Sequence, residues 1–193
     1  MDDKIRCAWC GDDPLYVQYH DEVWGVPVYN DQQLFAKLIL DGAQAGLSWI
    51  TILRRQENYY DAFDNFDPEK IARYDEDKIA ELLQNPGIIR NRLKVQSAVK
   101  NAKGYLKIKE EHDSFSDFLW QFVDGAPKVN GWQAMSDIPA ETAESHAMSK
   151  ALKKYGFSFV GPTICYAFMQ AVGMINDHVV DCFRYTECKD LAM

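Results

Sequence analysis

The spacing of apolar residues constrains the fold most, because it is helical along nearly the whole chain. In the clearest stretch, Val95, Ala98, Val99, Ala102 and Leu106 recur at positions i, i+3, i+4, i+7 and i+11. This spacing aligns the side chains on one face of a helix. No segment has the convincing alternation of apolar and polar residues that is typical of a strand. The sequence therefore predicts an all-α fold.

Helix-capping residues divide the chain into separate helices. Asp13 and Asp67 are each followed by proline, which combines an N-cap carboxylate with a residue suited to the first helical position. Further N-caps are expected at Asp31, Ser48 and Asp75. Residues 124–142 form the one long irregular connection. Other helices are predicted over residues 79–83, 116–123, 145–155 and 162–172.

The composition fits one compact domain or two small lobes, because the chain has 193 residues, of which 47% are apolar. Its net charge of −8 argues, taken alone, against a non-specific polyanion binder. Neither a transmembrane run nor the pattern of a signal peptide is evident. An odd number of cysteines, five, indicates a reducing compartment. We therefore expect a cytoplasmic protein without membrane association, and nothing in the sequence suggests an obligate partner.

Cysteine and histidine residues near both ends suggest a metal site. His178 and Cys182 are four residues apart, a spacing that on a helix places both on one face, and Cys7 and His20 lie near the other end. Together they form the Cys2His2 set of a closed zinc site, which would tie the two ends together. Cys10 and Cys188 are competing ligands, ordinary burial of these residues is the alternative, and Asp177 is interpreted as solvated or as a support for a ligand.

Basic residues are concentrated in two segments despite the acidic total. Residues 90–109 contain seven Lys or Arg and no acidic residue, and residues 147–176 are also free of Asp and Glu. In the second segment, a short turn over residues 156–161 connects two predicted helices next to Lys150, Lys153 and Lys154. Such a turn exposes backbone N–H groups that can hold a phosphate. Nucleic-acid binding and a solvated helical hairpin are both compatible with this pattern.

Asp41 lies on an apolar helix face, because Leu34, Leu38 and Asp41 fall at i, i+4 and i+7. A buried carboxylate requires a partner or a ligand. Tyr19 and Trp49 are candidates for aromatic walls beside it, and together these groups suit a cationic planar ring. The alternative is that Asp41 caps a local turn near Gly42.

Taken together, several motifs resemble the bacterial 3-methyladenine DNA glycosylase I family over nearly the whole chain. The stretches that carry the resemblance are Asp13-Pro-Leu-Tyr-Val-Gln-Tyr-His20, Glu22-Val-Trp-Gly-Val26, Gln44-Ala-Gly-Leu-Ser-Trp-Ile-Thr51, Pro86-Gly-Ile-Ile-Arg90, Phe157-Ser-Phe-Val-Gly161 and Asn176-Asp-His-Val-Val180. The resemblance implies a helix-hairpin-helix glycosylase fold and excision of 3-methyladenine from alkylated double-stranded DNA, with the free base as product. It implies a central domain over residues 28–142 and a lobe formed by residues 1–27 and 143–193, which is tethered by structural zinc and carries the hairpin.

The resemblance also assigns roles by position. The matched zinc ligands are Cys7, His20, His178 and Cys182. The matched base-pocket residues are Trp9, Tyr19, Trp49 and Asp41, of which Asp41 is the catalytic candidate. The matched DNA contacts are Gly46 and Leu47 in the gap-filling loop, and Lys153, Phe159, Val160 and Gly161 in the hairpin.

Three positions depart from the related patterns. The family's pocket carboxylate is usually Glu, whereas Asp41 is one methylene shorter. The wider superfamily's catalytic aspartate is replaced by Asn176, as in the rest of this family. Ser158 and Phe159 replace the superfamily's Pro-Gly pair in the hairpin.

The implied chemistry needs little acid catalysis. N3 alkylation places a positive charge on adenine, so bond cleavage releases a neutral base, and the enzyme mainly has to extrude and select the lesion. Asp41 is expected to accept hydrogen bonds from the base and to help stabilise an oxocarbenium-like sugar. A non-catalytic damage-sensing module is the competing hypothesis. A metallohydrolase is disfavoured, because a Cys2His2 site leaves zinc no vacant position.

Overall fold

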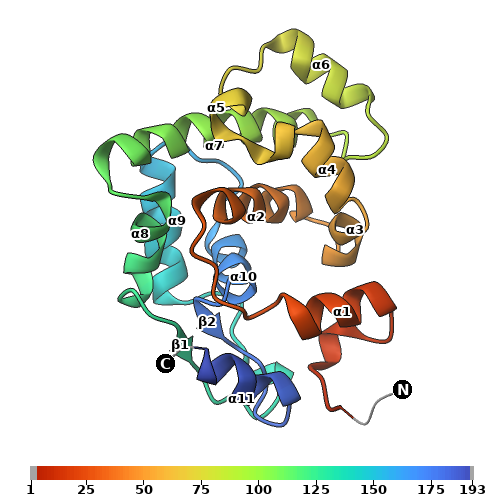
Figure 1. Ribbon diagram of the computed structural model, residues 1–193, viewed down its shortest axis with the longest axis vertical. Coiled ribbons are helices and arrows are strands. Elements are labelled where there is room, and N and C mark those ends of the chain that lie inside the picture. The colour runs from red at the N-terminus through yellow and green to blue at the C-terminus, as the bar shows by residue number, and fades with distance from the viewer. Residues whose placement is uncertain (1–3, 192–193) are drawn as a thin grey trace.

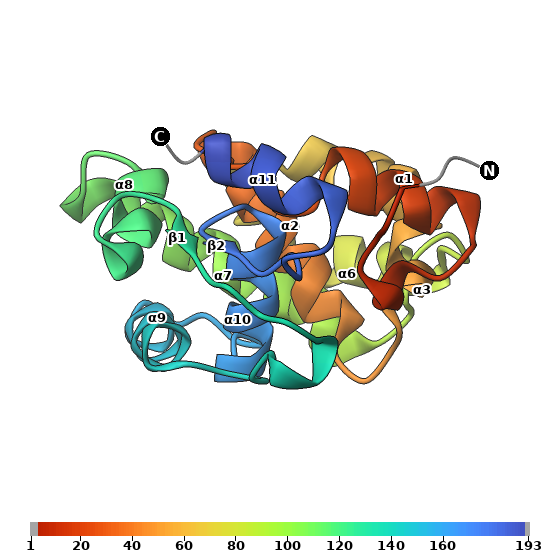
Figure 2. The same cartoon turned by 90° about the horizontal axis from the view of Figure 1, so that it is seen from below.

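The computed structural model describes residues 4–191, and helices form most of this length (Figures 1 and 2). In Figure 1 the long helix α7 crosses the upper half of the molecule with α6 above it, whereas α2 and α10 run through the middle. The helices are α1 (Pro14–Glu22), α2 (Asp31–Gln44), α3 (Trp49–Leu53), α4 (Gln56–Ala62), α5 (Pro68–Ile71), α6 (Glu76–Gln84), α7 (Arg92–Glu111), α8 (Phe115–Trp120), α9 (Ala143–Lys154), α10 (Pro162–Ala171) and α11 (Phe183–Asp190). Short 3-10 turns are η1 (Ala8–Cys10), η2 (Asp64–Phe66), η3 (Gln121–Val123) and η4 (Met135–Asp137).

The mostly helical architecture agrees with the all-α prediction, to which the structure adds two short strands that were not predicted. Strands β1 (Lys128–Val129) and β2 (Ile175–Asn176) pair in parallel, with Lys128 opposite Ile175. Strands of two residues are too short to produce a recognisable alternation of apolar residues, so the sequence pattern could not reveal them. The pair attaches the irregular segment 124–142 to the C-terminal part of the chain, and this segment otherwise matches the prediction.

Most predicted helix starts are confirmed, but Asp31 has a different role. The side chains of Asp13, Asp67 and Asp75 each accept hydrogen bonds from backbone N–H groups in the following turn. The N-cap of α2 is instead Asn30. Asp31 accepts hydrogen bonds from the N–H groups at the start of α8, 2.8 Å from Ser116 N, and thereby joins α2 to α8.

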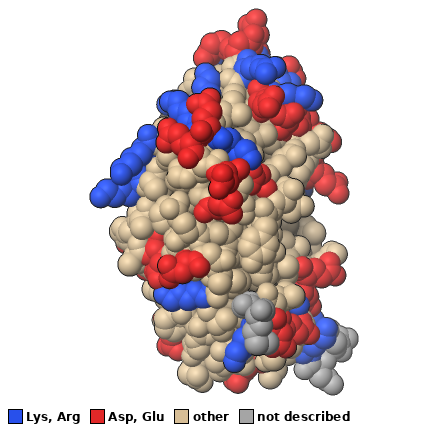
Figure 3. All heavy atoms as spheres, turned by 60° about the vertical axis from the view of Figure 1, so that its left-hand side comes forward, with Lys and Arg blue, Asp and Glu red and all other residues tan. Residues whose placement is uncertain are grey.

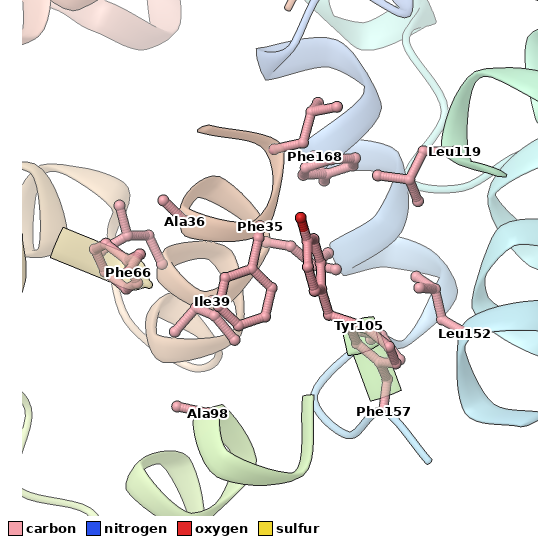
Figure 4. Packing of buried hydrophobic residues seen from close by; sticks show 14 of the residues in the cluster. Phe35, Ala36, Ile39, Phe66, Ala98, Tyr105, Leu119, Leu152, Phe157 and Phe168 are labelled. Carbon is pink, nitrogen blue, oxygen red and sulfur yellow. The ribbon is translucent and has the colours of Figure 1, made fainter. Parts of the chain in front are cut away.

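The core is built around the apolar face of α2. Phe35 and Ile39 of α2 pack with side chains from α7, α8, α9 and α10 (Figure 4). The predicted apolar stripe of α7 faces this core, because Val95, Ala98 and Ala102 are all buried. Each fully buried aliphatic or aromatic side chain contributes roughly 1.5–3 kcal/mol relative to an exposed one. This packing fixes α2, the helix that carries Asp41.

The N-terminal and C-terminal segments lie side by side. Helices α1 and α11 are neighbours in both views (Figures 1 and 2), and Phe183 N donates a hydrogen bond to Ile5 O at 3.0 Å. This arrangement brings residues from both ends of the sequence into one region of the molecule.

Charged side chains of both signs are mixed on the surface. On the face seen in Figure 3, acidic and basic groups lie close to one another. Different helices are joined by ion pairs such as Lys109–Asp31 at 2.8 Å and Arg92–Glu76 at 3.1 Å. Within residues 4–191, none of the helices is both long enough and apolar enough to span a bilayer.

Candidate functional site

A cavity of ≈ 420 Å³ opens between α1, α2, α3, α10 and the irregular segment near residue 138. Its volume falls within the range of roughly 300–1,000 Å³ that is usual for small-molecule pockets. The residues that line it are Trp9, Tyr16, Tyr19, Trp24, Lys37, Asp41, Gln44, Trp49, Met135, Ile138, Pro139, Ala140, Thr163, Tyr166, Ala167, Gln170 and Ala171. All four predicted base-pocket residues, Trp9, Tyr19, Asp41 and Trp49, therefore lie around one cavity.

Aromatic rings form one wall of the cavity. The ring centroids of Tyr19 and Trp49 are 5.4 Å apart, and Trp9 lies 5.1 Å from Trp24 and 5.0 Å from Tyr16. Helix α1 places Tyr16 and Tyr19 on one face, because residues three apart are neighbours on a helix surface. This wall presents electron-rich faces, which bind planar rings and cations.

Asp41 is buried in the last turns of α2, with 4% of its surface exposed. The helix continues to Gln44, so the alternative that Asp41 caps a turn near Gly42 is wrong. Its Oδ1 accepts a hydrogen bond from Lys37 Nζ. Burial raises the pKa of Asp41, and the Lys37 charge opposes this shift.

Lys37 also lines the cavity, and the sequence analysis did not single it out. Its Nζ lies 4.0 Å from the centre of the Trp49 ring while it contacts the Asp41 carboxylate. Burial lowers the pKa of Lys37, and the Asp41 carboxylate opposes this shift. The signal was available in the sequence, because a lysine and a carboxylate at i and i+4 are expected to pair on a helix.

Three buried polar atoms in this region have no hydrogen-bond partner among the described residues. They are the acceptor Asp41 Oδ2 and the donors Trp9 Nε1 and Trp49 Nε1. Buried polar groups are nearly always paired in native structures, so unpaired ones require an explanation. One acceptor and two donors around an aromatic cavity suit a planar ligand with both hydrogen-bond donors and acceptors.

Asp177 supports the opposite wall and is fully buried, so the expectation that it is solvated is wrong. Its carboxylate accepts hydrogen bonds from Tyr166 Oη at 2.5 Å and Gln170 Nε2 at 2.8 Å, and both donors line the cavity. It also accepts hydrogen bonds from Asn130 Nδ2 and Trp132 Nε1, each at 2.7 Å. Asp177 therefore joins α10 to the irregular segment that closes the cavity.

The loop after α2 is held at its base and exposed at its tip. Lys94 Nζ donates hydrogen bonds to Ala43 O and Ala45 O, both at 2.7 Å, which satisfies carbonyl groups at the end of the helix. Gly46 has φ +78, a conformation that favours glycine, and Leu47 is 37% exposed. The loop thus presents an apolar side chain at the rim near Gln44.

The predicted hairpin joins α9 and α10 through residues 155–161. Gly156 (φ +88) ends the first helix as predicted, and Pro162 begins the second. The buried amide of Asn101 on α7 holds the turn, since its Oδ1 accepts from Ser158 N at 2.8 Å and its Nδ2 donates to Ser158 O at 3.1 Å. Phe159 has φ +55, an uncommon value for a residue with a side chain.

The tip of this hairpin packs directly on the helix that carries Asp41. A Cβ at Gly42 would lie 3.2 Å from the Phe159 Cβ. Val160 is buried, and its carbonyl accepts a hydrogen bond from Ser149 Oγ at 2.6 Å. Val160 is therefore covered as a whole, whereas Phe159 and Gly161 on either side of it are partly exposed and Lys153 is exposed. The hairpin and the cavity are therefore mechanically connected through α2.

Cys7, His20, His178 and Cys182 form one buried cluster that could hold a metal ion. Their ligand atoms all lie within 4.8 Å of one another, and Cys182 Sγ is 3.5 Å from both His20 Nε2 and His178 Nδ1. For metal–ligand bonds of roughly 2.0–2.3 Å, tetrahedral zinc separates its nitrogen and sulfur ligands by about 3.5 Å. The competing residues Cys10 and Cys188 are buried outside this cluster. The donor set therefore fits zinc.

Neighbouring groups orient both imidazoles. His20 Nδ1 donates to Asp21 Oδ1 at 2.7 Å, and His178 Nε2 donates to Trp24 O at 3.2 Å. These hydrogen bonds leave His20 Nε2 and His178 Nδ1 directed toward the sulfur atoms, as ligand-supporting contacts do in metal sites. Hydrogen bonds from the other three members of the cluster lower the pKa of Cys182, and the one from Cys7 has the largest effect.

The backbone at the cluster corrects one prediction. His178 and Cys182 do not share a helix, because Cys182 is the N-cap of α11 and His178 precedes it in an irregular turn. The two side chains converge because Cys182 N donates to Val179 O at 2.8 Å and folds the chain back. The four-residue spacing of His178 and Cys182 did indicate that their side chains are close, but a turn rather than a helix brings them together.

This combination of a mostly helical frame, a helical hairpin and an aromatic cavity lined by the carboxylate of Asp41 is typical of proteins that enclose a small planar group. The chain matches the family model for methyladenine glycosylase over residues 9–185. It belongs to the methyladenine glycosylase family, and it is therefore an enzyme, a glycosylase.

Relatives and solved structures agree with this placement. The chain is 51% identical to DNA-3-methyladenine glycosylase 1 of Escherichia coli (strain K12) over 93% of this chain and 96% of that one. It is 49% identical to DNA-3-methyladenine glycosylase of Haemophilus influenzae, over 92% of this chain and 96% of that one. A crystal structure of a 3-methyladenine DNA glycosylase I superposes with a TM-score of 0.91 at 50% identity, over 93% of this chain and 98% of that one. The Staphylococcus aureus 3-methyladenine DNA glycosylase I, described in terms of 3-methyladenine recognition, superposes with a TM-score of 0.91 at 42% identity, over 93% of this chain and 96% of that one.

Proposed function

We propose that this protein is a monofunctional, monomeric DNA repair glycosylase that hydrolyses the N-glycosidic bond of 3-methyladenine in alkylated double-stranded DNA. The observation that carries the proposal is the aromatic cavity with the unpaired acceptor Asp41 Oδ2 and the unpaired donors Trp9 Nε1 and Trp49 Nε1. These groups match a flipped purine, which offers a planar face, ring nitrogens and an exocyclic amino group.

In the proposed complex, the aromatic residues enclose the extruded base. Tyr19 and Trp49 stack on it or donate hydrogen bonds, and Trp9 closes the wall beside them. Asp41 accepts a hydrogen bond from the base through Oδ2. Unstacking costs a few kcal/mol and less for a damaged base, so part of the selection for the lesion precedes pocket binding.

Asp41 is the proposed catalytic residue. Because the alkylated ring already carries a positive charge, the glycosidic electron pair neutralises it as the bond breaks, and the leaving base needs no added proton. The Asp41 carboxylate stabilises the positive charge that the sugar develops during cleavage. Water then completes the hydrolysis at the sugar carbon.

The proposed DNA-binding surface combines the loop at Gly46 and Leu47 with the α9–α10 hairpin. Exposed Leu47 would fill the gap that the extruded base leaves in the duplex. In the hairpin, the partly exposed backbone of Phe159 and Gly161 would bind phosphate as a helix-hairpin-helix motif, with buried Val160 anchoring the turn between them and the exposed charge of Lys153 assisting. A shallow hollow beside Lys150, Lys153 and Pro162 at the start of α10 supports this placement.

The proposed metal is one structural zinc ion held by Cys7, His20, His178 and Cys182. A four-ligand site leaves no open position for water, so bound zinc would crosslink the chain ends rather than act on the substrate. In this proposal, residues 1–27 and 143–193 form the tethered lobe and residues 28–142 the central domain. The cavity then lies at their junction, since Tyr19 and Tyr166 come from the first and Asp41 and Trp49 from the second.

The test is release of free base from duplex DNA treated with a methylating agent. Purified protein is incubated with this DNA, and released bases are separated by chromatography. We expect 3-methyladenine in the soluble fraction and a phosphodiester backbone that stays intact until alkali is added. Binding of the methylated duplex without release of any base would overturn the proposal and identify a non-catalytic damage-sensing module.

A further inference from the structure

The cavity contains an internal cation that none of the roles above requires. Lys37 Nζ donates a hydrogen bond to Asp41 Oδ1 and lies 4.0 Å from the centre of the Trp49 ring. The Lys37 side chain is 15% exposed and lines the cavity, so its ammonium group borders the space that a ligand would occupy.

The ammonium group already makes the two interactions that would attract a cationic ring. A cation is drawn to an aromatic face and to a carboxylate, and both effects strengthen when the groups are desolvated. Lys37 uses the Trp49 face and one oxygen of Asp41. Within residues 4–191, Lys37 and Asp41 are the only charged residues that line the cavity. The cavity therefore presents no net charge to a ligand while both groups are ionised.

We propose that Lys37 is a specificity-determining residue that competes with a positively charged base for Trp49 and Asp41. The inference rests on the proposed function, since it concerns how the same cavity chooses its ligand. A cationic base must share the cavity with a like charge or displace the ammonium group, whereas a neutral base of the same shape meets no such repulsion. Selection in this cavity therefore depends on shape and hydrogen bonding more than on charge.

The position of Lys37 on α2 forces any ligand in the cavity to lie near its ammonium group. Lys37 and Asp41 are one turn apart on α2, whose surrounding residues Leu34, Leu38 and Leu40 are buried in the core. The helix therefore cannot rotate to withdraw Lys37 without exposing its apolar face. Only rotation of the Lys37 side chain about its own bonds can clear the Trp49 ring.

The test compares binding of two probes by calorimetry at pH 8. The 3,9-dimethyladeninium ion carries a permanent positive charge, and 3-methyladenine is neutral at this pH. The measured quantity is the ratio of the two affinities, so that general effects of a substitution on the cavity cancel. Lys37→Met removes the charge with little change in length, and Lys37→Arg is the matched control that retains it.

We expect Lys37→Met to raise the ratio of cation affinity to neutral-base affinity by about tenfold, because the Trp49 face and Asp41 become available to the probe. Lys37→Arg should leave the ratio close to that of the unchanged protein. A Lys37→Met protein that binds 3-methyladenine but keeps the ratio within about twofold would overturn the inference.

A second pair of variants covers the case in which Lys37→Met leaves Asp41 unpaired and prevents folding. Asp41→Asn is compared with the double variant Lys37→Met/Asp41→Asn, in which neither position of the Lys37–Asp41 pair carries a charge. The double variant should again show the higher ratio, because the Trp49 ring is free of the ammonium group. Equal ratios in this pair would contradict the inference.

The base-release assay separates this inference from the proposed function. A shift in the probe ratio without any base release would support the role of Lys37 and reject the glycosylase activity on 3-methyladenine. Base release together with an unchanged ratio would reject the role of Lys37 alone.

Discussion

Replacing Asn101 with alanine tests whether α7 holds the hairpin in place. Asn101 is 2% exposed, and its amide makes two hydrogen bonds with the backbone of Ser158. Each such bond contributes about 0.5–1.5 kcal/mol net, and a partner left unsatisfied costs about 1–3 kcal/mol when it is buried. Ser158 is only half-buried, so water can partly replace the lost partner. We expect Asn101→Ala to lower the free energy of unfolding by about 2–3 kcal/mol.

The measurement is denaturant unfolding of Asn101→Ala beside the unchanged protein. A loss of about 1 kcal/mol lowers the melting temperature of a chain this long by roughly 2–4 °C. The expected loss of about 2–3 kcal/mol should therefore lower the melting temperature of Asn101→Ala by about 4–12 °C. Glu110→Ala, at an exposed position on the same helix, is the control and should change stability by less than about 0.5 kcal/mol.

Affinity for a duplex containing an abasic-site analogue, measured by fluorescence anisotropy, gives a second readout. The turn that Asn101 holds includes the proposed phosphate-binding backbone, so Asn101→Ala should weaken DNA binding under conditions where the protein remains folded. A loss of stability below about 0.5 kcal/mol would refute the reasoning. Unchanged DNA affinity in the folded variant would refute the link between this amide and the hairpin's function.

Three further predictions concern the pocket, the metal cluster and one close contact. Asp41→Asn should slow single-turnover excision by about 10–100-fold and weaken 3-methyladenine binding, because a charged hydrogen bond of about 1.5–3 kcal/mol is lost. Asp41→Glu should retain most of the excision rate and of the affinity. Unchanged binding by Asp41→Asn would contradict direct contact with the base. Prolonged chelation should lower the melting temperature and Zn²⁺ should restore it, and Cys182→Ser should abolish this dependence on metal; a melting curve insensitive to chelator would exclude a structural metal. Gly173→Ala should destabilise the protein by about 2–5 kcal/mol in thermal unfolding, because its φ is +70 and the added Cβ would lie 2.4 Å from Pro27 N; a normal melting temperature would show that the chain can relax there.

Local sequence patterns predicted most helices because capping and apolar spacing act within one or two turns. Asp13, Asp67 and Asp75 cap the helices that follow them, and the apolar stripe that begins at Val95 faces the core. Asp31 was misassigned because its partners at Phe115 and Ser116 lie far away in the sequence. The same limitation concealed the two-residue strands, whose pairing depends entirely on a distant segment.

The candidate site was predictable in its composition but not in its electrostatics. Asp41, Tyr19 and Trp49 were proposed from the residue pattern and then, together with Trp9, from motif resemblance, and all four line one cavity. Lys37 was overlooked, because a lysine four residues before an aspartate usually forms an ordinary surface pair. Its proximity to Trp49 depends on how α3 packs against α2, which spacing along one helix cannot reveal.

The cavity wall is assembled from parts of the chain that are synthesised far apart in time. Tyr19 emerges early, Asp41 and Trp49 follow, and Tyr166 and Gln170 come near the end, as do Asp177, which holds them, and Cys182 of the metal cluster. A chain that stops before Tyr166 lacks one wall of this cavity, whatever the state of the helices that precede it. Under the proposed function, such a fragment cannot enclose a base.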